Sequence, residues 1–469
     1  MATVLCPGCQ ERDARIAALE QQVAELQAAV RDLTARLGTN ATNSGTPPSA
    51  NPPGAPKPVT KQRTGKKPGG QPGHPPRLKQ RLPPERLHQV IPFVPSHCDR
   101  CQELLPSQAA PDDPAPTWHQ VAEVPKLAAL VTEYQGHYRT CPCCGQLNHA
   151  PIPANLKAHS IGPRLAATLG YLAGSHRAST RGLEEITEDV FDVPISLGTV
   201  ANLRAEVSAA LAPAHAQAIQ AVRDAPVKNV DETSWKLAGK LCWLWVAATS
   251  TVAAFLIHGK RSWKALTALL GEKVKGFVCS DRWSAYARLS PYCRQICWAH
   301  LKRDFQKLVD RGGAAARLGQ QLLGLTERVF TEWHLFRGGG CDRRQLQRRL
   351  DGPARALERV LRAGRRCADG KAATFCVNVL ELLPAVWRFV VSAGVEPTNN
   401  HAERVLRRGV LWRKNAFGSH SEEGCRFVER MLTVVQTRRL QGRSVLAYLY
   451  EALVAHRQAL PAPTLLVAG

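Results

Sequence analysis

Two aspartates stand directly after short apolar runs and are candidate metal ligands. Asp231 follows residues 227–230, at the end of the first strand expected in a sheet, and Asp281 follows residues 277–280, at the end of the fourth. A carboxylate in that place is fixed by the sheet yet open to solvent. If the first and fourth strands are neighbours, the two charges lie side by side and repel unless a divalent cation lies between them.

Glu403 offers a third carboxylate, because it lies at the start of an expected helix that can be laid on the same sheet. A few oxygen ligands with open positions between them suit Mg²⁺ or Mn²⁺. Two such ions about 4 Å apart activate a water or a 3′-hydroxyl and stabilise the leaving oxygen of an in-line displacement at phosphorus. The three residues therefore indicate metal-dependent phosphoryl transfer.

Each carboxylate also has an ordinary structural alternative. Asp231 suits a turn, and Asp281 could cap the helix that follows it. Glu403 has capping-box spacing from Asn400 and could pair with Arg407 one helical turn later. The catalytic interpretation is favoured because all three occur together on matching elements of one fold.

Polar and basic side chains surround the third carboxylate in the sequence. His300 could approach a scissile phosphate, and Asn400 and His401 adjoin Glu403, although a lone histidine is more often structural. Five basic residues further along are candidate phosphate contacts, with a solvated basic face as the alternative; they are Arg404, Arg407, Arg408, Arg413 and Lys414.

Two cysteine pairs have the spacing of a structural zinc site. Cys98 and Cys101 form one C-x₂-C pair, and Cys141 and Cys144 form the other. Together they offer four thiolates for a tetrahedral Zn²⁺, with His97, Cys143 and His149 as possible substitutes. Without metal, so small a module has too little core to be stable alone.

A heptad pattern near the N-terminus predicts self-association. Its apolar positions alternate spacings of three and four, at Ile16, Leu19, Val23, Leu26, Val30, Leu33 and Leu37. β-Branched residues at a with leucine at d favour a parallel two-stranded coiled coil; the alternative is one amphipathic helix packed on its own protein. Cys6 and Cys9 precede the pattern, and two copies could share one interchain zinc site, or remain exposed thiols.

Composition points to a polyanionic partner. Lys and Arg total 62 against 38 Asp and Glu, a formal charge of +24, which favours nucleic acid because each neutralised phosphate releases a counterion. A generally basic surface is the alternative. The sequence has no apolar run of membrane-spanning length and no signal peptide at its start, so we expect a cytoplasmic protein without a membrane partner, whose 15 cysteines are metal ligands and buried thiols.

Strand and helix patterns around the carboxylates have the order of a ribonuclease H-like core. Apolar runs rich in Val, Ile, Trp and Phe predict strands, and two helices separate the last three; the expected strands are 227–230, 242–250, 251–258, 276–280 and 294–298, and the helices are 262–270 and 283–289. Residues 300–391 are almost all helical in pattern, which indicates an inserted domain.

A turn entering a helix near residue 196 is a candidate helix-turn-helix. The preceding helix is expected at 182–191, and Ser196 or Thr199 could cap the one that follows. The candidate DNA contacts are Ser196, Thr199, Asn202 and Arg204. Two packed helices with no DNA contact are the alternative.

The motifs, taken in order, resemble those of the insertion sequence 66 family of DDE transposases, nearly end to end. The matching segments are the heptad helix, the basic linker at 67–74, the cysteine module, 231–233, Ser280-Asp281 with Tyr286, 297–300, Asn399-Asn400, 402–404, 413–415 and 418–419. The resemblance implies an RNase H-like domain with Asp231, Asp281 and Glu403 as its metal-binding triad, a helical insertion, and accessory proteins encoded nearby. Thr398 departs from relatives that carry an acidic residue there.

We therefore expect a multidomain α+β chain with a coiled coil, a zinc module, a helical DNA-binding region and an RNase H-like core. The expected boundaries are 1–38, 39–82, 83–155, 156–224, 225–310, 311–390, 391–420 and 421–469, with 39–82 a basic linker, 311–390 the insertion, 391–420 the return to the core and 421–469 a helical end. The expected function is a bacterial, nucleoid-associated transposase, dimeric or larger, that binds the ends of its mobile element, cuts them and joins the 3′ ends to target DNA. A DNA-binding protein that has lost its chemistry, or a nuclease that cuts without joining, is the alternative.

Overall fold

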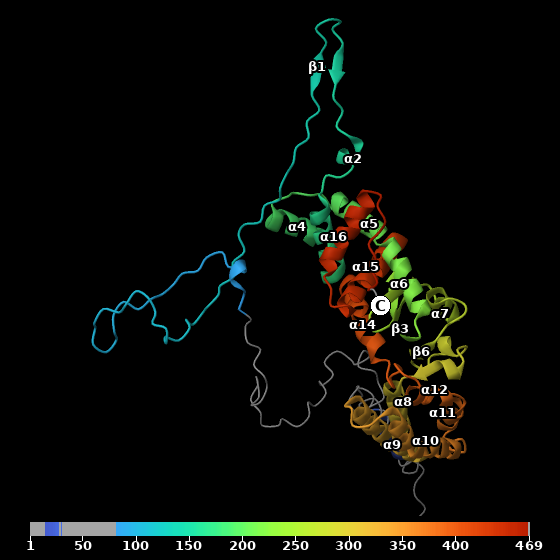
Figure 1. The fold of residues 1–469 in the computed structure, drawn as a ribbon. Coiled ribbons are helices and arrows are strands. Elements are labelled where there is room, and N and C mark those ends of the chain that lie inside the picture. The colour runs from blue at the N-terminus through green and yellow to red at the C-terminus, as the bar shows by residue number, and fades with distance from the viewer. Residues whose placement is uncertain (1–14, 28–29, 31–80, 468–469) are drawn as a thin grey trace, which may run out of the picture.

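The computed structural model describes residues 15–27, 30 and 81–467. Within these ranges the chain mixes many helices with one large sheet, which confirms the expected α+β class. Figure 1 shows the sheet inside the main body, with α5 and α16 toward one end and α9, α10 and α11 toward the other. The expected basic linker lies almost wholly outside the described residues, as do Cys6 and Cys9.

The main sheet has five strands in the order β5-β4-β3-β6-β7. Its first three strands are antiparallel neighbours, whereas β6 runs parallel to β3 and β7 runs parallel to β6. The strands are β3 (Val227–Leu237), β4 (Lys240–Ala248), β5 (Ala253–His258), β6 (Phe277–Ser280) and β7 (Arg294–Ile296). The first and fourth strands are therefore adjacent.

Two boundaries differ from the sequence prediction. β3 was expected to end before Asp231 but continues to Leu237, because β4 pairs with it from Asn229 onward across a two-residue turn at Ala238 and Gly239. Both turn residues have positive φ (47° and 79°), which suits the twist of a tight hairpin. The helix expected at 283–289 is only a 3₁₀ turn, η4 (Ser284–Tyr286).

The edge strand β5 is covered by helix α15 (Glu422–Leu440). Alternate N–H groups of β5 donate to side-chain oxygens four residues apart on α15, in the pairs Ala253 to Thr437, Phe255 to Thr433 and Ile257 to Glu429, at 3.0, 3.0 and 2.5 Å. The periods match, because four helical residues rise about 6.0 Å and two strand residues about 6.6 Å. The helix thus satisfies an edge that would otherwise invite pairing with another chain.

Helices flank the sheet in sequence on both sides. Before it come α3 (Pro163–Tyr171), the π-helical turn η3 (Leu172–His176), α4 (Thr180–Phe191), α5 (Leu197–Ala210) and α6 (Ala212–Asp224). Helix α7 (Trp263–Leu270) lies between β5 and β6, and α14 (Asn400–Ala416), α15 and α16 (Val445–Arg457) close the described chain. Helix α14 packs on β3 and β4.

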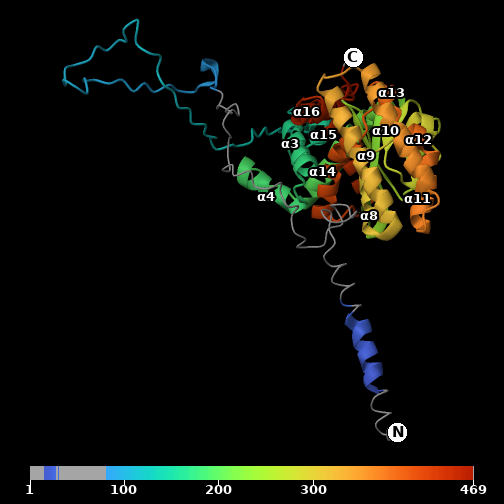
Figure 2. The same cartoon turned by 90° about the horizontal axis from the view of Figure 1, so that it is seen from below.

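The segment between β7 and α14 is a helical body with its own apolar core. It contains α8 (Trp298–Asp310), α9 (Gly313–Arg337), α10 (Arg343–Gly364), α11 (Gly370–Glu381), α12 (Leu383–Val386) and α13 (Arg388–Val391). A separate buried cluster runs through these helices and reaches the sheet at Cys279 and Ile296. Figure 2 shows α8, α9 and α10 side by side. The rigid junction places α8 at the end of the sheet.

Residues 81–158 hold little regular structure. They contain η2 (Pro84–Arg86), the hairpin of β1 (Tyr138–Thr140) and β2 (Leu147–His149), and α2 (Ala154–Lys157). The hairpin extends beyond α4 and α16 in Figure 1. None of the helices within the described ranges combines the length and apolar character needed to cross a bilayer.

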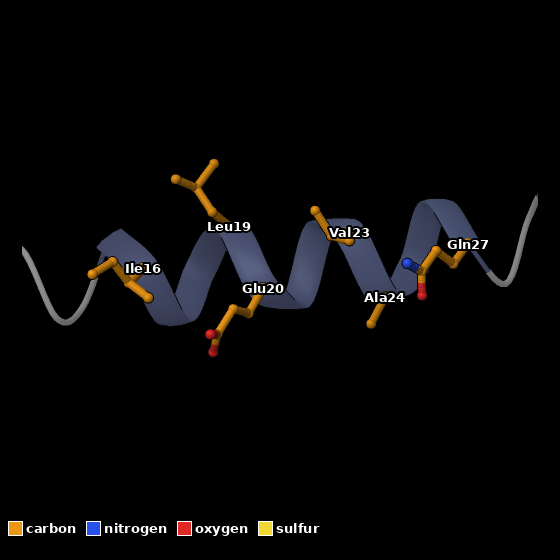
Figure 3. A pocket seen from close by; sticks show the side chains of 6 residues that line it. All are labelled: Ile16, Leu19, Glu20, Val23, Ala24 and Gln27. Atoms are coloured by element: carbon orange, nitrogen blue, oxygen red, sulfur yellow. The ribbon is translucent and has the colours of Figure 1, made fainter.

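The N-terminal segment 15–27 is helical, as the heptad pattern predicts. Ile16, Leu19 and Val23 are each about half exposed, at 47%, 53% and 51%. Figure 3 shows Leu19 and Val23 on one side of the helix axis and Glu20 and Ala24 on the other. The last two heptad positions, Leu33 and Leu37, lie outside the described residues.

The contact between α8 and α9 depends on a glycine. A methyl group at Gly319 would lie 2.7 Å from the carbonyl oxygen of Phe305 and 2.8 Å from the backbone nitrogen of Val309. We predict that Gly319→Ala lowers the free energy of unfolding by about 1–3 kcal/mol, because the helices must separate. The matched control is Gly324→Ala on the same helix, where nothing lies within 4 Å; it should stabilise by roughly 0.5–1 kcal/mol. Denaturant unfolding measures both, and equal effects would contradict the packing.

Candidate active site

The parallel pairing of β3 and β6 brings the two aspartates together. Asn229 lies opposite Cys279 in the register of the two strands. Two residues further along each chain, the same register places Asp231 opposite Asp281. Neighbouring strands lie about 4.8 Å apart, so the two carboxylates start from adjacent positions at one end of the sheet.

The turn after β6 is braced from β7. The carboxylate of Asp281 accepts the N–H of Trp283 at 2.9 Å. Arg294, which is buried, donates to the Ser280 hydroxyl and the Tyr286 carbonyl, both at 3.1 Å, and also to the carbonyl of Asp281. The guanidinium of Arg294 therefore fixes the backbone of the turn that carries Asp281.

The third carboxylate is positioned through Asn399, which precedes α14. The buried Asn399 amide donates to the carbonyl of Val230 at 2.7 Å and accepts from the Asn229 amide at 3.0 Å. Its backbone N–H donates to the sulfur of Cys297 at 3.1 Å. The carbonyl of Asn399 accepts the N–H of Glu403 at 3.3 Å. One side chain therefore ties the first turn of α14 to the strand that carries Asp231.

The three carboxylates are close enough to affect one another. Burial raises the pKa of Asp231 well above its usual value, and the charges of Glu232, Asp281 and Glu403 raise it further. Burial and the charge of Asp281 likewise raise the pKa of Glu232. A divalent cation among these groups would remove the repulsion, so the all-oxygen donor set fits Mg²⁺ or Mn²⁺.

Glu232 is a buried acidic neighbour that sequence analysis did not single out. Its carboxylate accepts from Arg261 at 2.7 Å and from the hydroxyl of Tyr286. The Arg261 guanidinium also lies 3.9 Å from the ring centre of Trp283. These contacts fix Glu232 as a positioning residue beside the aspartates.

His300 lies beside Glu403, as its candidate role requires. Its Nδ1 is 3.7 Å from the Glu403 carboxylate, and Arg303 is 3.8 Å from the same oxygen. Burial lowers the pKa of His300, and the charge of Arg303 lowers it further, while Asp281 and Glu403 oppose this. His401, in contrast, is hydrogen bonded to the Thr249 carbonyl at 2.7 Å and is structural.

A tighter group of ligand atoms forms around Glu403. One ligand atom from each of Cys297, His300 and Glu403 lies within 4.8 Å of the other two. Among the described residues, no other set of three His, Cys, Asp or Glu side chains is this close. The predicted triad of Asp231, Asp281 and Glu403 does not meet this limit, and its members are spread more widely.

The basic candidates on α14 divide into two sets. Arg404, Arg407 and Lys414 are exposed and free to meet a ligand. Arg413 instead donates to the Thr233 hydroxyl at 3.0 Å and to the Ser234 carbonyl at 2.9 Å, and Arg408 reaches the Ser175 carbonyl at 3.5 Å. The expectation that Arg413 contacts phosphate is thus corrected, because its guanidinium holds α14 to β3. Asn400 is exposed.

A shallow pocket of about 690 Å³ lies between the turn after β6 and the helical insertion. Arg282, which follows Asp281, contributes to its wall and is paired with Asp304 of α8 at 2.8 Å. Arg311 and Lys371 add positive charge, although Arg311 is paired with Asp369 at 2.7 Å. Two of its three cations are therefore neutralised by acidic neighbours.

The candidate helix-turn-helix residues occupy the start of α5. The Ser196 hydroxyl accepts the N–H of Thr199 at 3.2 Å and caps the helix, and Asn202 is exposed. Arg204 differs from its expected role, because its guanidinium lies 4.8 Å from the ring centre of Phe427 and burial lowers its pKa. It packs α5 against α15 instead of facing outward.

The two cysteine pairs form similar turns but do not lie together. Cys98 and Cys141 each accept backbone N–H groups within their own turn, which lowers the pKa of both thiols. A residue with positive φ, Gln102 or Gly145, follows each pair. The four sulfurs of the two pairs do not form a cluster within 4.8 Å in the described residues.

Comparison with known proteins identifies the family. The chain matches the family described as Transposase IS66 family over residues 159–426, more than half its length. A family of unknown function matches residues 5–80. An uncharacterized protein of Sinorhizobium fredii, y4qI, is 26% identical over 202 residues, which cover 40% of this chain and 37% of that protein. The chain thus spans little more than a third of that relative's length.

The raised pKa of Asp231 predicts how stability depends on pH. The native state keeps this proton to higher pH than the unfolded chain, so without divalent cation stability falls as pH rises above the unfolded pKa of about 3.9. At pH 7 in chelator, we predict that Asp231→Asn raises Tm, by roughly 2–4 °C for each kcal/mol of relieved repulsion. Adding Mg²⁺ should raise the Tm of the natural protein more than that of the variant.

The matched control is Asp304→Asn, which removes a carboxylate paired with Arg282 and Lys307 and should lower Tm. Thermal unfolding followed by circular dichroism distinguishes the expected rise in Tm for Asp231→Asn from the expected fall for Asp304→Asn. A lower Tm for Asp231→Asn in chelator would show that its carboxylate is not under repulsion.

Asn399 and its neighbour Asn400 form a second matched pair. We predict that Asn399→Ala lowers the free energy of unfolding by about 1–3 kcal/mol, because buried groups on β3 lose their partners. It should also weaken Mg²⁺ binding, since Glu403 is no longer held. Asn400→Ala, at an exposed position, should stay within about 0.5 kcal/mol. Denaturant unfolding and Mg²⁺ titration test both, and a neutral Asn399→Ala would refute the positioning role.

Proposed function

The chain belongs to the IS66 family of transposases, and we propose that it is a DDE transposase that cuts the ends of its mobile element and joins the 3′ ends to target DNA. The observation that supports the proposal is that the β3–β6 register brings Asp231 and Asp281 to neighbouring positions and that the charge of Glu403 acts on Asp231. The three carboxylates come from β3, from the turn after β6 and from the first turn of α14.

The sheet supports an RNase H-like core. Its first three strands form an antiparallel meander, and the fourth and fifth continue from the first strand in parallel. The parallel pairing of β3 with β6 ends at Asn229 and Cys279, so the residues that follow on the two strands are neighbours. The helical body between β7 and α14 fits the expected insertion between the second aspartate and the glutamate.

The three carboxylates would hold two Mg²⁺ or Mn²⁺ ions, which when bound activate the attacking hydroxyl and stabilise the leaving oxygen. The protein's own groups prepare the site for DNA. Arg404, Arg407 and Lys414 are exposed along α14 and can neutralise backbone phosphates on either side of the scissile bond. His300, which faces Glu403, can donate a hydrogen bond toward a phosphate oxygen.

Other regions would bind and organise the DNA ends. Helices α4 and α5 have the order of a helix-turn-helix, and Asn202 lies on the exposed side of α5. We further propose that a structural Zn²⁺ joins the pairs Cys98/Cys101 and Cys141/Cys144. The two turns do not lie together in this structure, so binding would require them to meet.

Assembly and location complete the proposal. The exposed apolar face at Ile16, Leu19 and Val23 favours a homodimer or larger oligomer, formed through a coiled coil. With a charge of +24, the protein would stay near the bacterial nucleoid in the cytoplasm. Small accessory proteins encoded nearby are further candidate partners.

A strand-transfer assay on a DNA fragment carrying the element's ends tests the function. We predict that Asp231→Asn, Asp281→Asn and Glu403→Gln each reduce cleavage and joining by about 10³-fold or more, because the metals supply several kcal/mol of transition-state stabilisation. Glu423→Gln is the control, since Glu423 is also an exposed glutamate in the first turn of a helix. It should leave the rate unchanged.

Two results would contradict the proposal in different ways. DNA binding without any cleavage by the natural protein would indicate a DNA-binding protein that has lost its chemistry. Cleavage without joining would indicate a nuclease on the same fold.

A further inference from the structure

Three side chains of mixed chemistry meet at the base of the helical insertion. Cys297 precedes α8, His300 lies in the first turn of α8, and Glu403 lies in the first turn of α14. A sulfur, a ring nitrogen and a carboxylate oxygen of these residues lie within 4.8 Å of one another. The set differs from the Asp231 and Asp281 pair, whose donors are oxygens alone.

We propose that Cys297, His300 and Glu403 bind a thiophilic divalent cation such as Zn²⁺, at a site that shares Glu403 with the carboxylate triad. One cysteine, one histidine and one glutamate are ligands that Zn²⁺ accepts at about 2.3, 2.0 and 2.1 Å. Mg²⁺ prefers an octahedron of oxygens and would not favour the sulfur. The two sites therefore differ in their ligand atoms, and so in the metal ion that each prefers.

The geometry requires small movements only. Ligand atoms of a tetrahedral zinc site lie roughly 3.3–3.7 Å apart, as follows from the bond lengths. The Nδ1 of His300 and the Glu403 carboxylate are already 3.7 Å apart. The widest separation in the group, at most 4.8 Å, must close by about 1 Å, which leaves the fourth position open to water or a substrate oxygen.

A second, independent observation is the free nitrogen of His300. Its Nδ1 is shielded from solvent and makes no hydrogen bond. A buried polar atom without a partner is unusual in a native structure, and an unseen ion is one of its ordinary explanations. A cation bound between His300 and Glu403 would satisfy this atom.

The sulfur of Cys297 is buried and faces a backbone N–H group. The Asn399 N–H lies 3.1 Å from the sulfur. A bound cation compensates the charge of the buried thiolate, and a coordinating thiol is deprotonated outright.

The consequence for activity rests on the proposed function. Glu403 cannot serve the cation at Cys297 and the pair of ions at Asp231 and Asp281 with the same geometry. A thiophilic ion would therefore withdraw the third carboxylate and hold the enzyme inactive until it is removed. Thiophilic metals become inhibitors of this site at concentrations far below those of Mg²⁺.

Binding of Co²⁺ to the metal-free, full-length protein tests the site without DNA or turnover. The cobalt bound per chain and the near-ultraviolet thiolate band are measured in the natural protein, Cys297→Ser and His300→Ala. The other cysteine pairs are present in every sample, so any cobalt that they bind is the same in all three proteins and does not affect the comparison. We expect about one ion fewer per chain in each variant, or affinity at least about 10-fold weaker.

Cys279→Ser is the matched control, because Cys279 is a buried thiol near Cys297 that the ligand group does not include. It should bind as much cobalt as the natural protein. If Cys297→Ser does not fold, His300→Ala decides, since His300 is partly exposed. Unchanged cobalt binding in either folded variant overturns the proposed site.

The result is separable from the proposed function. Loss of cobalt in the two variants supports the site even if the natural protein performs no strand transfer. Strand transfer that proceeds in Mg²⁺, combined with unchanged cobalt binding in the variants, leaves the transposase proposal standing and removes this one.

Discussion

The parallel pairing of β3 with β6 sets Asp231 and Asp281 side by side, with Glu403 near enough for its charge to act on Asp231, and the proposed site depends on that arrangement. Burial raises the pKa of Asp231 well above its usual value, and the neighbouring carboxylates raise it further. No single local contact could impose the arrangement, because Asp231 and Glu403 are far apart in the sequence. The restraint is instead distributed over β3, β6 and α14, each fixed separately to the sheet.

Buried polar side chains supply that restraint. Asn399 links α14 to β3 and to the start of α8, and Arg294 holds the turn that carries Asp281. On the far edge of the sheet, α15 accepts from three N–H groups of β5, so these groups are not left open to pair with another strand. A site whose ligands repel needs such stiffness, because a soft frame would relax by letting the ligands separate.

The sequence alone predicted most of the strands, because their signals are local. Runs of Val, Ile, Trp and Phe indicated the strands, and an Asp directly after such a run marked its end. Asp231 was wrongly placed at the end of its strand, since only pairing with β4 extends β3 to Leu237. The role of Asn399 was missed for the same reason: its partners lie about 170 residues away, and as a sequence signal it suggests no more than a helix cap. Arg204 and Arg413 carried the signal of phosphate contacts, yet Arg204 packs on the ring of Phe427 and Arg413 donates to β3.

The central claim is that the triad binds a pair of divalent ions, and electron paramagnetic resonance of bound Mn²⁺ tests it most directly. We predict two Mn²⁺ ions per chain whose signals are coupled, as expected for ions about 4 Å apart, and loss of the coupling in Glu403→Gln. A single uncoupled ion, or coupled ions that persist without Glu403, would contradict the account.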